Sequence, residues 1–258
     1  MTKTFQKIIF GFLLIFPQFS FASIVFQFAF VYPGGEGTKA AAKPFLDELM
    51  NQIKKNGGPT MQAAYYPSLD EGVEAVRFKK AQVGIVSYDF YFSNKERFPM
   101  EILLSTIPVS TSKPEEQSYL MMHQSTLLPQ GGSLTIFTSR NLGDDFLRTV
   151  VFRGYTSSLL KFEIDPNILV RLKSLSGTQN AVLLDSFEYK ALKNLKLPWI
   201  NELQTVYTSN PYPSAPVVSF VPLESELKAQ LTKSLLKVAK NPQSQEILNQ
   251  LRLQGFTQ

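Results

Sequence analysis

Apolar and polar positions follow the same order twice along this chain, in segments 68–91 and 166–189. Each segment begins with apolar residues at the spacing of an amphipathic helix. A short polar break then leads to a four-residue apolar run, at 83–86 in the first segment and at 181–184 in the second. A short apolar run after a helix is typical of a buried parallel strand. The pattern therefore predicts two α/β lobes of similar design.

Both apolar runs end in a polar turn that contains aromatic residues, at 87–89 and at 185–187. In open α/β sheets, ligands bind beyond the carboxyl ends of the strands. We therefore expect the two turns to face one cleft between the lobes.

The elements around these two units predict how the rest of the chain is organised. Strands are expected at 24–31, 61–65, 83–86 and 102–107, with helices that begin at Thr38 and at the capping box of Ser68 and Glu71. This is a right-handed βαβαβ arrangement. We assign residues 23–110 to the first part of lobe 1.

A polar segment bounded by prolines, 108–114, is the candidate hinge. Lobe 2 is expected over 111–206, with strands at 118–123, 134–138, 150–153 and 203–207 and a short helix at 143–149. Residues 207–258 form a return segment and two helices, the second capped by Asn241, that pack back on lobe 1. The predicted fold class is therefore a two-lobed α/β protein with mixed, mostly parallel sheets.

The N-terminus has the pattern of a secretory signal. Lys3 and Lys7 precede a nine-residue apolar run, and the small residues Ser20 and Ala22 predict cleavage before Ser23. The run is much shorter than the roughly 20 residues that span a bilayer. We interpret residues 1–22 as a signal peptide, with an uncleaved N-terminal anchor as the alternative. The chain contains no Cys, and an exported protein of this size without disulfides fits a bacterial periplasm.

Composition limits the chemistry that is available. A net charge of +5, evenly spread, slightly favours an anionic ligand and does not indicate nucleic-acid binding. With a single His and no Cys, most zinc, copper and haem sites are excluded. There is no nucleotide-binding loop and no nucleophile–base pattern. We expect no catalytic residue, no metal and no cofactor.

The residue types at the predicted strand ends suit noncovalent binding. Tyr32, Tyr66 and Tyr88 follow the first three strands, and a Tyr side chain offers a rigid apolar face with a hydroxyl. Each of them could equally be structural.

Two further candidates come from the predicted second lobe. Thr138, Ser139 and Arg140 link a strand to a helix, where hydroxyls and free N–H groups can hold an anion or simply cap the helix. Asp185 can accept hydrogen bonds from a ligand, or cap the helix that follows.

Several motifs occur together and in order: 66–76 with 83–86, then 180–185, 212–218 and 243–256. In these the whole mature chain resembles the periplasmic substrate-binding proteins of the phosphate/phosphite/phosphonate ABC-transporter type. The resemblance implies a type-II periplasmic binding fold, a hinge and transient docking to a membrane permease. Phosphonate-binding members carry a Ser-Thr-Ser-Gly-like turn where this chain has Thr138 to Asn141.

Three hypotheses remain open. The first is a periplasmic protein that captures a small anionic, phosphate- or phosphonate-like ligand and delivers it to an ABC permease. The second is a binding or sensor module on the same scaffold for a lipid-like ligand or a protein partner. The third, an exported enzyme, lacks any catalytic constellation to support it. In the first two, the chain meets the membrane only through its partner or an uncleaved signal.

Overall fold

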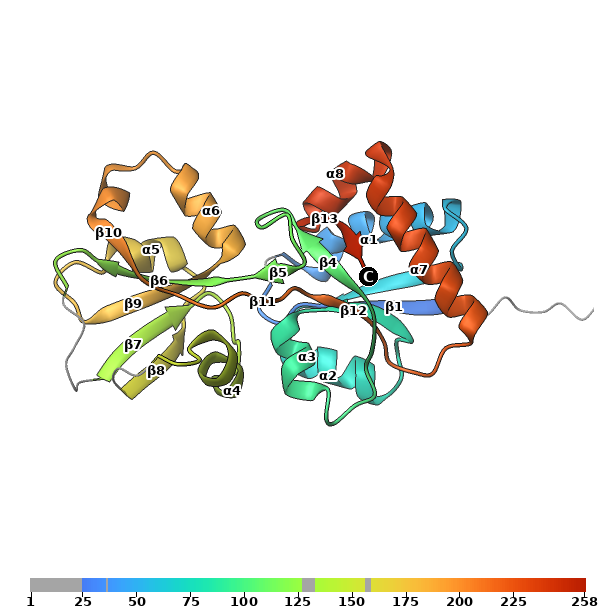
Figure 1. Cartoon of the computed structure of the whole chain (residues 1–258), viewed down its shortest axis with the longest axis horizontal. Coiled ribbons are helices and arrows are strands. Elements are labelled where there is room, and N and C mark those ends of the chain that lie inside the picture. The colour runs from blue at the N-terminus through green and yellow to red at the C-terminus, as the bar shows by residue number, and fades with distance from the viewer. Residues whose placement is uncertain (1–24, 36, 127–132, 156–158) are drawn as a thin grey trace, which may run out of the picture.

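The computed structural model describes residues 25–35, 37–126, 133–155 and 159–258, and it contains two lobes joined by crossing segments (Figure 1). The predicted signal peptide, 1–22, lies outside the described residues. Within the described ranges, no helix combines the length and the apolar character needed to cross a membrane.

Lobe 1 is built on a six-stranded sheet with the order β13-β4-β12-β3-β1-β2. Its strands are β1 (Phe26–Val31), β2 (Met61–Tyr66), β3 (Val83–Val86), β4 (Glu101–Pro108), β12 (Pro216–Ser219) and β13 (Leu253–Thr257). The first three are mutually parallel, whereas β12 and β13 run antiparallel to their neighbours. The strands come from both ends of the chain, so the returning segment completes lobe 1.

Helices cover both faces of this sheet (Figure 1). One face carries α1 (Lys39–Lys55), α7 (Ser225–Lys240) and α8 (Pro242–Gln250); the other carries α2 (Leu69–Arg77) and α3 (Tyr88–Asn94). Side chains on β1 alternate between the two layers, because successive residues of a strand point to opposite faces. Phe28 packs under α1 and α7, while Ala29 and Val31 pack under α2 and α3.

Short polar side chains begin these helices at the predicted residues, although the Glu71 carboxylate pairs with Lys39 instead of completing a capping box with Ser68. The hydroxyl of Thr38 accepts from the N–H of Ala41 at 3.2 Å, and that of Ser68 accepts from the N–H of Glu71 at 3.2 Å. Asn241 accepts from the N–H of Gln243 at 3.0 Å. Each bond satisfies a helix N–H that has no partner within its own helix.

Lobe 2 has a five-stranded sheet with the order β10-β6-β9-β7-β8. The strands are β6 (Ser118–His123), β7 (Ser133–Thr138), β8 (Leu159–Ile164), β9 (Asn180–Asp185) and β10 (Leu203–Thr208). The four strands β6-β9-β7-β8 repeat the arrangement of β12-β3-β1-β2, including the antiparallel strand on the same side. The two lobes therefore share one topology, and the duplicated sequence units provide β3 and β9.

The helices of lobe 2 are short. They are α4 (Asp144–Phe146), a π-helical turn (Leu147–Val151), α5 (Ile168–Lys173), α6 (Ser186–Asn194) and a 3₁₀ segment (Pro198–Glu202). The predicted strand at 150–153 is wrong: residues 150 and 151 lie in the π-helical turn, and the strand is β8. Val151 and Phe152 are buried against the sheet of lobe 2, so they are apolar for packing rather than for strand pairing.

Two short antiparallel strands connect the lobes, β5 (Glu115–Glu116) and β11 (Tyr212–Pro213). Tyr212 pairs with Glu116 in register, and its hydroxyl lies 2.9 Å from the Ser118 hydroxyl. The chain thus crosses between lobes twice, and the two crossings are bonded to each other. Such a double connection allows the lobes to rotate about it without separating.

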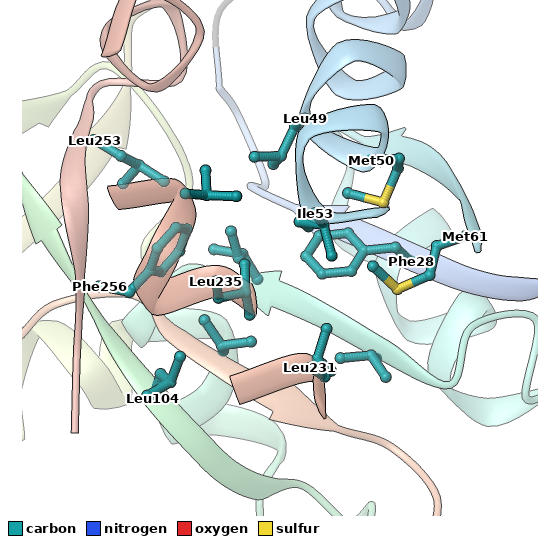
Figure 2. Close-up of a cluster of buried hydrophobic side chains, with 14 of the residues drawn as sticks. Phe28, Leu49, Met50, Ile53, Met61, Leu104, Leu231, Leu235, Leu253 and Phe256 are labelled. Atoms are coloured by element: carbon teal, nitrogen blue, oxygen red, sulfur yellow. The ribbon is translucent and has the colours of Figure 1, made fainter. Parts of the chain in front are cut away.

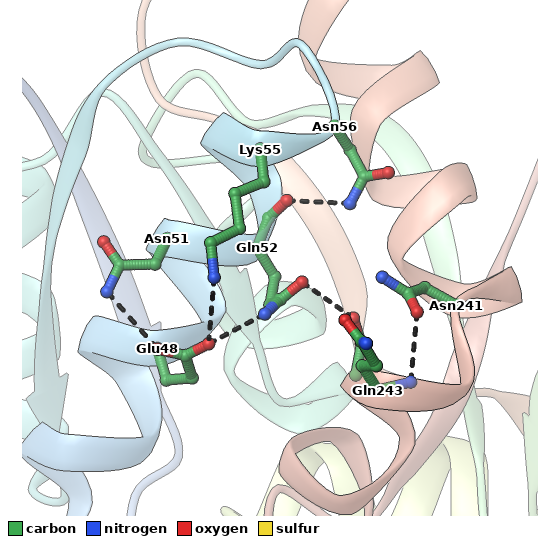
Figure 3. Close-up of polar contacts among 8 residues, drawn as sticks. Glu48, Asn51, Gln52, Lys55, Asn56, Asn241 and Gln243 are labelled. Carbon is green, nitrogen blue, oxygen red and sulfur yellow. Dashed lines mark hydrogen bonds and ion pairs between the residues drawn. The ribbon is translucent and has the colours of Figure 1, made fainter.

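The largest part of the core lies between the lobe 1 sheet and α1, α7 and α8 (Figure 2). Phe28, Ile53 and Leu235 are at most 1% exposed there. A polar contact fastens α8 to α1 beside this core (Figure 3). The buried Gln52 donates to Glu48 at 2.7 Å and accepts from the Ser244 hydroxyl at 3.3 Å, so its amide is satisfied on both sides.

We predict that Phe28→Ala lowers the free energy of unfolding by about 3–5 kcal/mol, because it leaves a cavity in this core. The matched control is Phe78→Ala: Phe78 is 60% exposed, and its truncation should stay within about 0.5 kcal/mol of the parent. Urea denaturation of both variants measures the difference. Equal midpoints would show that the core is not formed as described.

Candidate ligand-binding site

The carboxyl ends of four strands, two from each lobe, bring polar residues together between the lobes. Tyr32 follows β1, Asp89 lies in the first turn after β3, Arg140 follows β7, and Asp185 ends β9. The pKa of Arg140 responds to the other three groups, which places all four in one electrostatic neighbourhood. This is the position where open α/β sheets bind ligands.

A buried ion pair joins the lobes at this point. Arg140 Nη1 of lobe 2 donates to Asp89 Oδ1 of lobe 1 at 2.8 Å, with the two side chains 10% and 7% exposed. The Arg140 guanidinium also lies over the Tyr32 ring, with 4.6 Å between Cζ and the ring centroid. Burial by itself lowers the pKa of Arg140, but Asp89 and Tyr32 raise it well above its usual value, so the residue stays charged.

The loop after β1 also touches lobe 2 at Arg140. Gly34 has φ +71°, and a Cβ atom added there would lie 2.3 Å from the Arg140 Cβ. Only glycine allows this backbone both its conformation and its close approach to the other lobe. The loop that follows β1 therefore brings its backbone directly against lobe 2.

A cavity of about 240 Å³ lies behind these contacts. Lobe 1 supplies most of its wall, the crossing strand β5 supplies Glu116, and lobe 2 supplies Asp185 and Phe187. Its aromatic and aliphatic residues include Phe30, Tyr32, Phe45, Leu46, Tyr65, Ile85, Phe187, Leu251 and Leu253. A pocket that is mainly apolar with a few polar groups is the usual form of a small-molecule site.

Carboxyl groups at the cavity and beside it are destabilised in their charged form. Burial, reinforced by the nearby Asp185, raises the pKa of Glu116 to about 7. Burial and the same aspartate raise the pKa of Glu188 to about 7 as well. Burial also raises the pKa of Tyr32 far above its usual value, which keeps the phenol protonated.

The residues predicted from the sequence fall in three places. Tyr32 and Asp185 lie on the wall of the main cavity. Tyr88 and Arg140, together with Tyr32, line a second space of about 10 Å³, too small for a ligand. The ring centroid of Tyr88 lies 6.2 Å from that of Tyr212, so Tyr88 packs at the junction of the lobes.

The remaining predicted residues, Tyr66, Thr138 and Ser139, line neither space. Tyr66 lies under the Lys39 ammonium group, 5.8 Å from Nζ to the ring centroid. The Thr138 hydroxyl donates to the Arg140 carbonyl at 2.8 Å, and the Ser139 side chain lowers the pKa of the nearby Glu188. Asp185 also caps α6, since its Oδ1 accepts from the N–H of Glu188 at 2.8 Å.

Four residues that sequence reasoning did not single out belong to the site: Asp89, Glu116, Phe187 and Arg252. Asp89 and Phe187 lie in the two polar turns that the repeat identified, so the repeat itself was the available signal. Glu116 and Arg252 reach the cavity only through the crossing and the C-terminal return, which the local pattern does not reveal.

No protein-family model matches the sequence, and no curated protein sequence matches it. Solved structures do resemble it. XAC2383 from Xanthomonas citri, bound to chloride, has a TM-score of 0.68 at 12% identity, with 91% of each chain covered. PhnD1 from Prochlorococcus marinus, in complex with methylphosphonate, gives 0.62 at 11% identity, over 91% of this chain and 92% of that one.

A third neighbour is the binding-protein component of an ABC phosphonate transporter from Pseudomonas aeruginosa. It gives a TM-score of 0.60 at 16% identity, over 90% of this chain and 80% of that one. This chain has the type-II periplasmic binding protein fold. The fold expectation from the sequence is thereby confirmed, as a divergent form in which the lobes are joined by β5 and β11.

We predict that Asp89→Asn opens the lobes by weakening the ion pair with Arg140. Removing one partner of a buried pair costs about 3–5 kcal/mol, so the ligand-free radius of gyration in small-angle X-ray scattering should increase. The control is Asp144→Asn, which removes an exposed ion pair with Arg148 inside lobe 2 and should leave the radius unchanged. An unchanged radius for Asp89→Asn would contradict the role of the pair.

A second prediction concerns pH. Because the pKa of Glu116 is raised in the folded state, its contribution to stability is fully present below about pH 4.5 and is lost as pH rises through about 7. Asp185 and Asp89 raise this pKa, and Arg140 and Arg252 lower it. Glu116→Gln should therefore be more stabilising, relative to the parent, at pH 8 than at pH 5.

Chemical denaturation of both proteins at the two pH values measures this difference. Glu115→Gln is the matched control, since Glu115 lies on the same strand but pairs with Lys113 at the surface, 3.5 Å away. A pH-independent effect of Glu116→Gln would show that Glu116 titrates normally.

Proposed function

We propose that this chain is a solute-binding protein whose two lobes close around a small molecule without altering it. The observation that carries the proposal is the cavity of about 240 Å³, which takes wall residues from both lobes and from the crossing strand β5. A ligand there contacts both lobes at once, and a ligand that contacts both lobes favours the closed state over the open one. The volume lies below the roughly 300–1,000 Å³ of drug-sized pockets, so the ligand is small.

Delivery to a membrane ABC permease from the periplasm is part of this proposal. It is supported by the signal-like pattern of residues 1–22 and by two of the structural neighbours, which are a PhnD protein and a component of a phosphonate transporter. The neighbours were solved with chloride and with methylphosphonate. At such low identity those ligands do not transfer to this chain.

The second candidate is a binding or sensor module for an apolar or lipid-like ligand, which the apolar wall of the cavity favours. The two functions use the same cavity but differ in the class of ligand and in the protein partner. Pull-down from host membranes that recovers a permease and its ATPase supports transport; recovery of a receptor supports sensing.

We predict that protein purified from its host carries a small solute, seen as excess mass in native mass spectrometry and released on unfolding. The chain has no Cys, so Lys54→Cys in lobe 1 and Lys173→Cys in lobe 2 give two clean sites for fluorescent labels. Adding the released solute back to stripped protein should shift the energy transfer between the labels, because the lobes close.

The control pair, Lys54→Cys with Lys233→Cys, lies within lobe 1 and should give a constant signal. The proposal fails if no solute is carried and neither host extract nor concentrated metabolite mixtures move the interlobe signal.

A further inference from the structure

The cavity wall has two chemically distinct parts. Phe30, Phe45 and Tyr65, with neighbouring aliphatic residues, form an apolar and aromatic part. The carboxyl groups of Glu116 and Asp185 form a polar part, where β5 and the end of β9 meet. A bound molecule is therefore offered an apolar surface together with hydrogen-bond acceptors.

Of the two acids, Glu116 gives the stronger indication of the kind of ligand that binds. It is half-buried, and its carboxylate has no hydrogen bond and no ion pair with any residue that the structure describes. It lines both the main cavity and the small space beside Arg140. Partial burial disfavours the charged form of this carboxyl group, and a ligand with a hydrogen-bond donor would offset this cost.

Asp185 has capacity for a ligand as well. Its Oδ1 accepts the N–H of Glu188 at 2.8 Å, while Oδ2 makes no hydrogen bond within the described residues. An ionised carboxylate offers about four acceptor positions. Capping α6 and binding a ligand are therefore compatible for this residue.

The two guanidinium groups nearby contact other protein groups, although both also lower the pKa of Glu116. Arg140 is paired with Asp89 at 2.8 Å, and the Arg252 guanidinium lies over the Phe187 ring, 4.0 Å from Cζ to the centroid. The described cavity wall thus carries two carboxyl groups and one guanidinium. An oxyanion placed against Glu116 and Asp185 would meet like charge, which is unfavourable in a desolvated site.

We propose that the cavity binds a small organic cation: an amine or ammonium group against Glu116 and Asp185, attached to a compact apolar or aromatic body against Phe30 and Tyr65. This inference rests on the proposed function and names its ligand class. Aromatic rings beside the acids add to the attraction, because a cation is stabilised over the face of an aromatic ring.

Isothermal titration calorimetry on stripped protein at pH 8 tests this with four probes: 2-phenylethylamine, its neutral counterpart 2-phenylethanol, the anion 3-phenylpropionate, and methylphosphonate. The amine is expected to bind at least about tenfold more tightly than the alcohol, since a hydrogen bond to a charged group is stronger than one between neutral groups. Neither anion should bind measurably.

Glu116→Gln should weaken amine binding by about 10- to 100-fold, and the affinity of the parent should fall from pH 8 to pH 5 as Glu116 is protonated. Glu115→Gln, the surface control, should bind as the parent does. Thermal unfolding of each variant checks that it is folded.

The inference is overturned if either anion binds more tightly than the amine, if no amine binds, or if Glu116→Gln leaves amine affinity unchanged. In these cases the proposed function survives as long as the carried solute still closes the lobes. Loss of both the amine signal and all ligand-driven closure would instead remove the proposed function.

Discussion

Arg140 can lie buried between the two lobes because Asp89 meets it there. Removing a guanidinium from water costs several kcal/mol unless an opposite charge and good hydrogen bonds replace the solvent. The 2.8 Å contact supplies both across the interlobe boundary. The Arg140–Asp89 contact between the lobes and the position of Tyr32 under the guanidinium therefore belong together.

The same pair also affects which charged groups a ligand can contact, because Arg140 and Asp89 already neutralise each other. Thr138, Ser139 and Arg140, which follow β7, are the residues from which the sequence predicts a possible anion site. In the structure these residues bond to other protein groups. The Thr138 hydroxyl donates to the Arg140 carbonyl, and the Arg140 guanidinium donates to Asp89. Since α4 begins with Asp144 and Asp145, its positive end is already offset by acidic side chains. Thr138 and Arg140 therefore contact other protein groups, whereas Glu116 and Asp185 line the cavity.

Much of the fold could be predicted because its signals are local. The apolar runs at β3 and β9 and the caps at Thr38, Ser68 and Asn241 depend on residues near each other in sequence. The local sequence pattern fails to predict the structure where a segment is buried by elements that are distant in the sequence. The apolar pattern at Val151 and Phe152 predicts a strand, but these side chains are apolar because they pack against the lobe 2 sheet. The polar residues at 87–89 predict a turn, whereas the chain continues there into α3.

The candidate site was predictable only in part, for the same reason. Tyr32 and Asp185 stand at strand ends, which the pattern locates, and the structure places both on the cavity wall, where their role in binding stays a prediction. Whether a side chain at such a position faces a ligand or the other lobe depends on how the two lobes pack against each other. Arg140 and Tyr88 face the neighbouring lobe, and Glu116 enters the site through a crossing whose register only the folded chain defines.

The assembly of lobe 1 from both ends of the chain has a consequence for how the molecule forms. All five strands of lobe 2 lie between residues 118 and 208, whereas β12 and β13 of lobe 1 come later. Ribosomes deliver a chain from its N-terminus, so the second lobe can complete its sheet while the first still lacks two of its six strands. Exposed strand edges invite wrong pairing, and those of β3 and β4 stay uncovered until the tail emerges. The lobe with most of the cavity wall is therefore the last to complete its sheet as the chain emerges, in whichever compartment it folds.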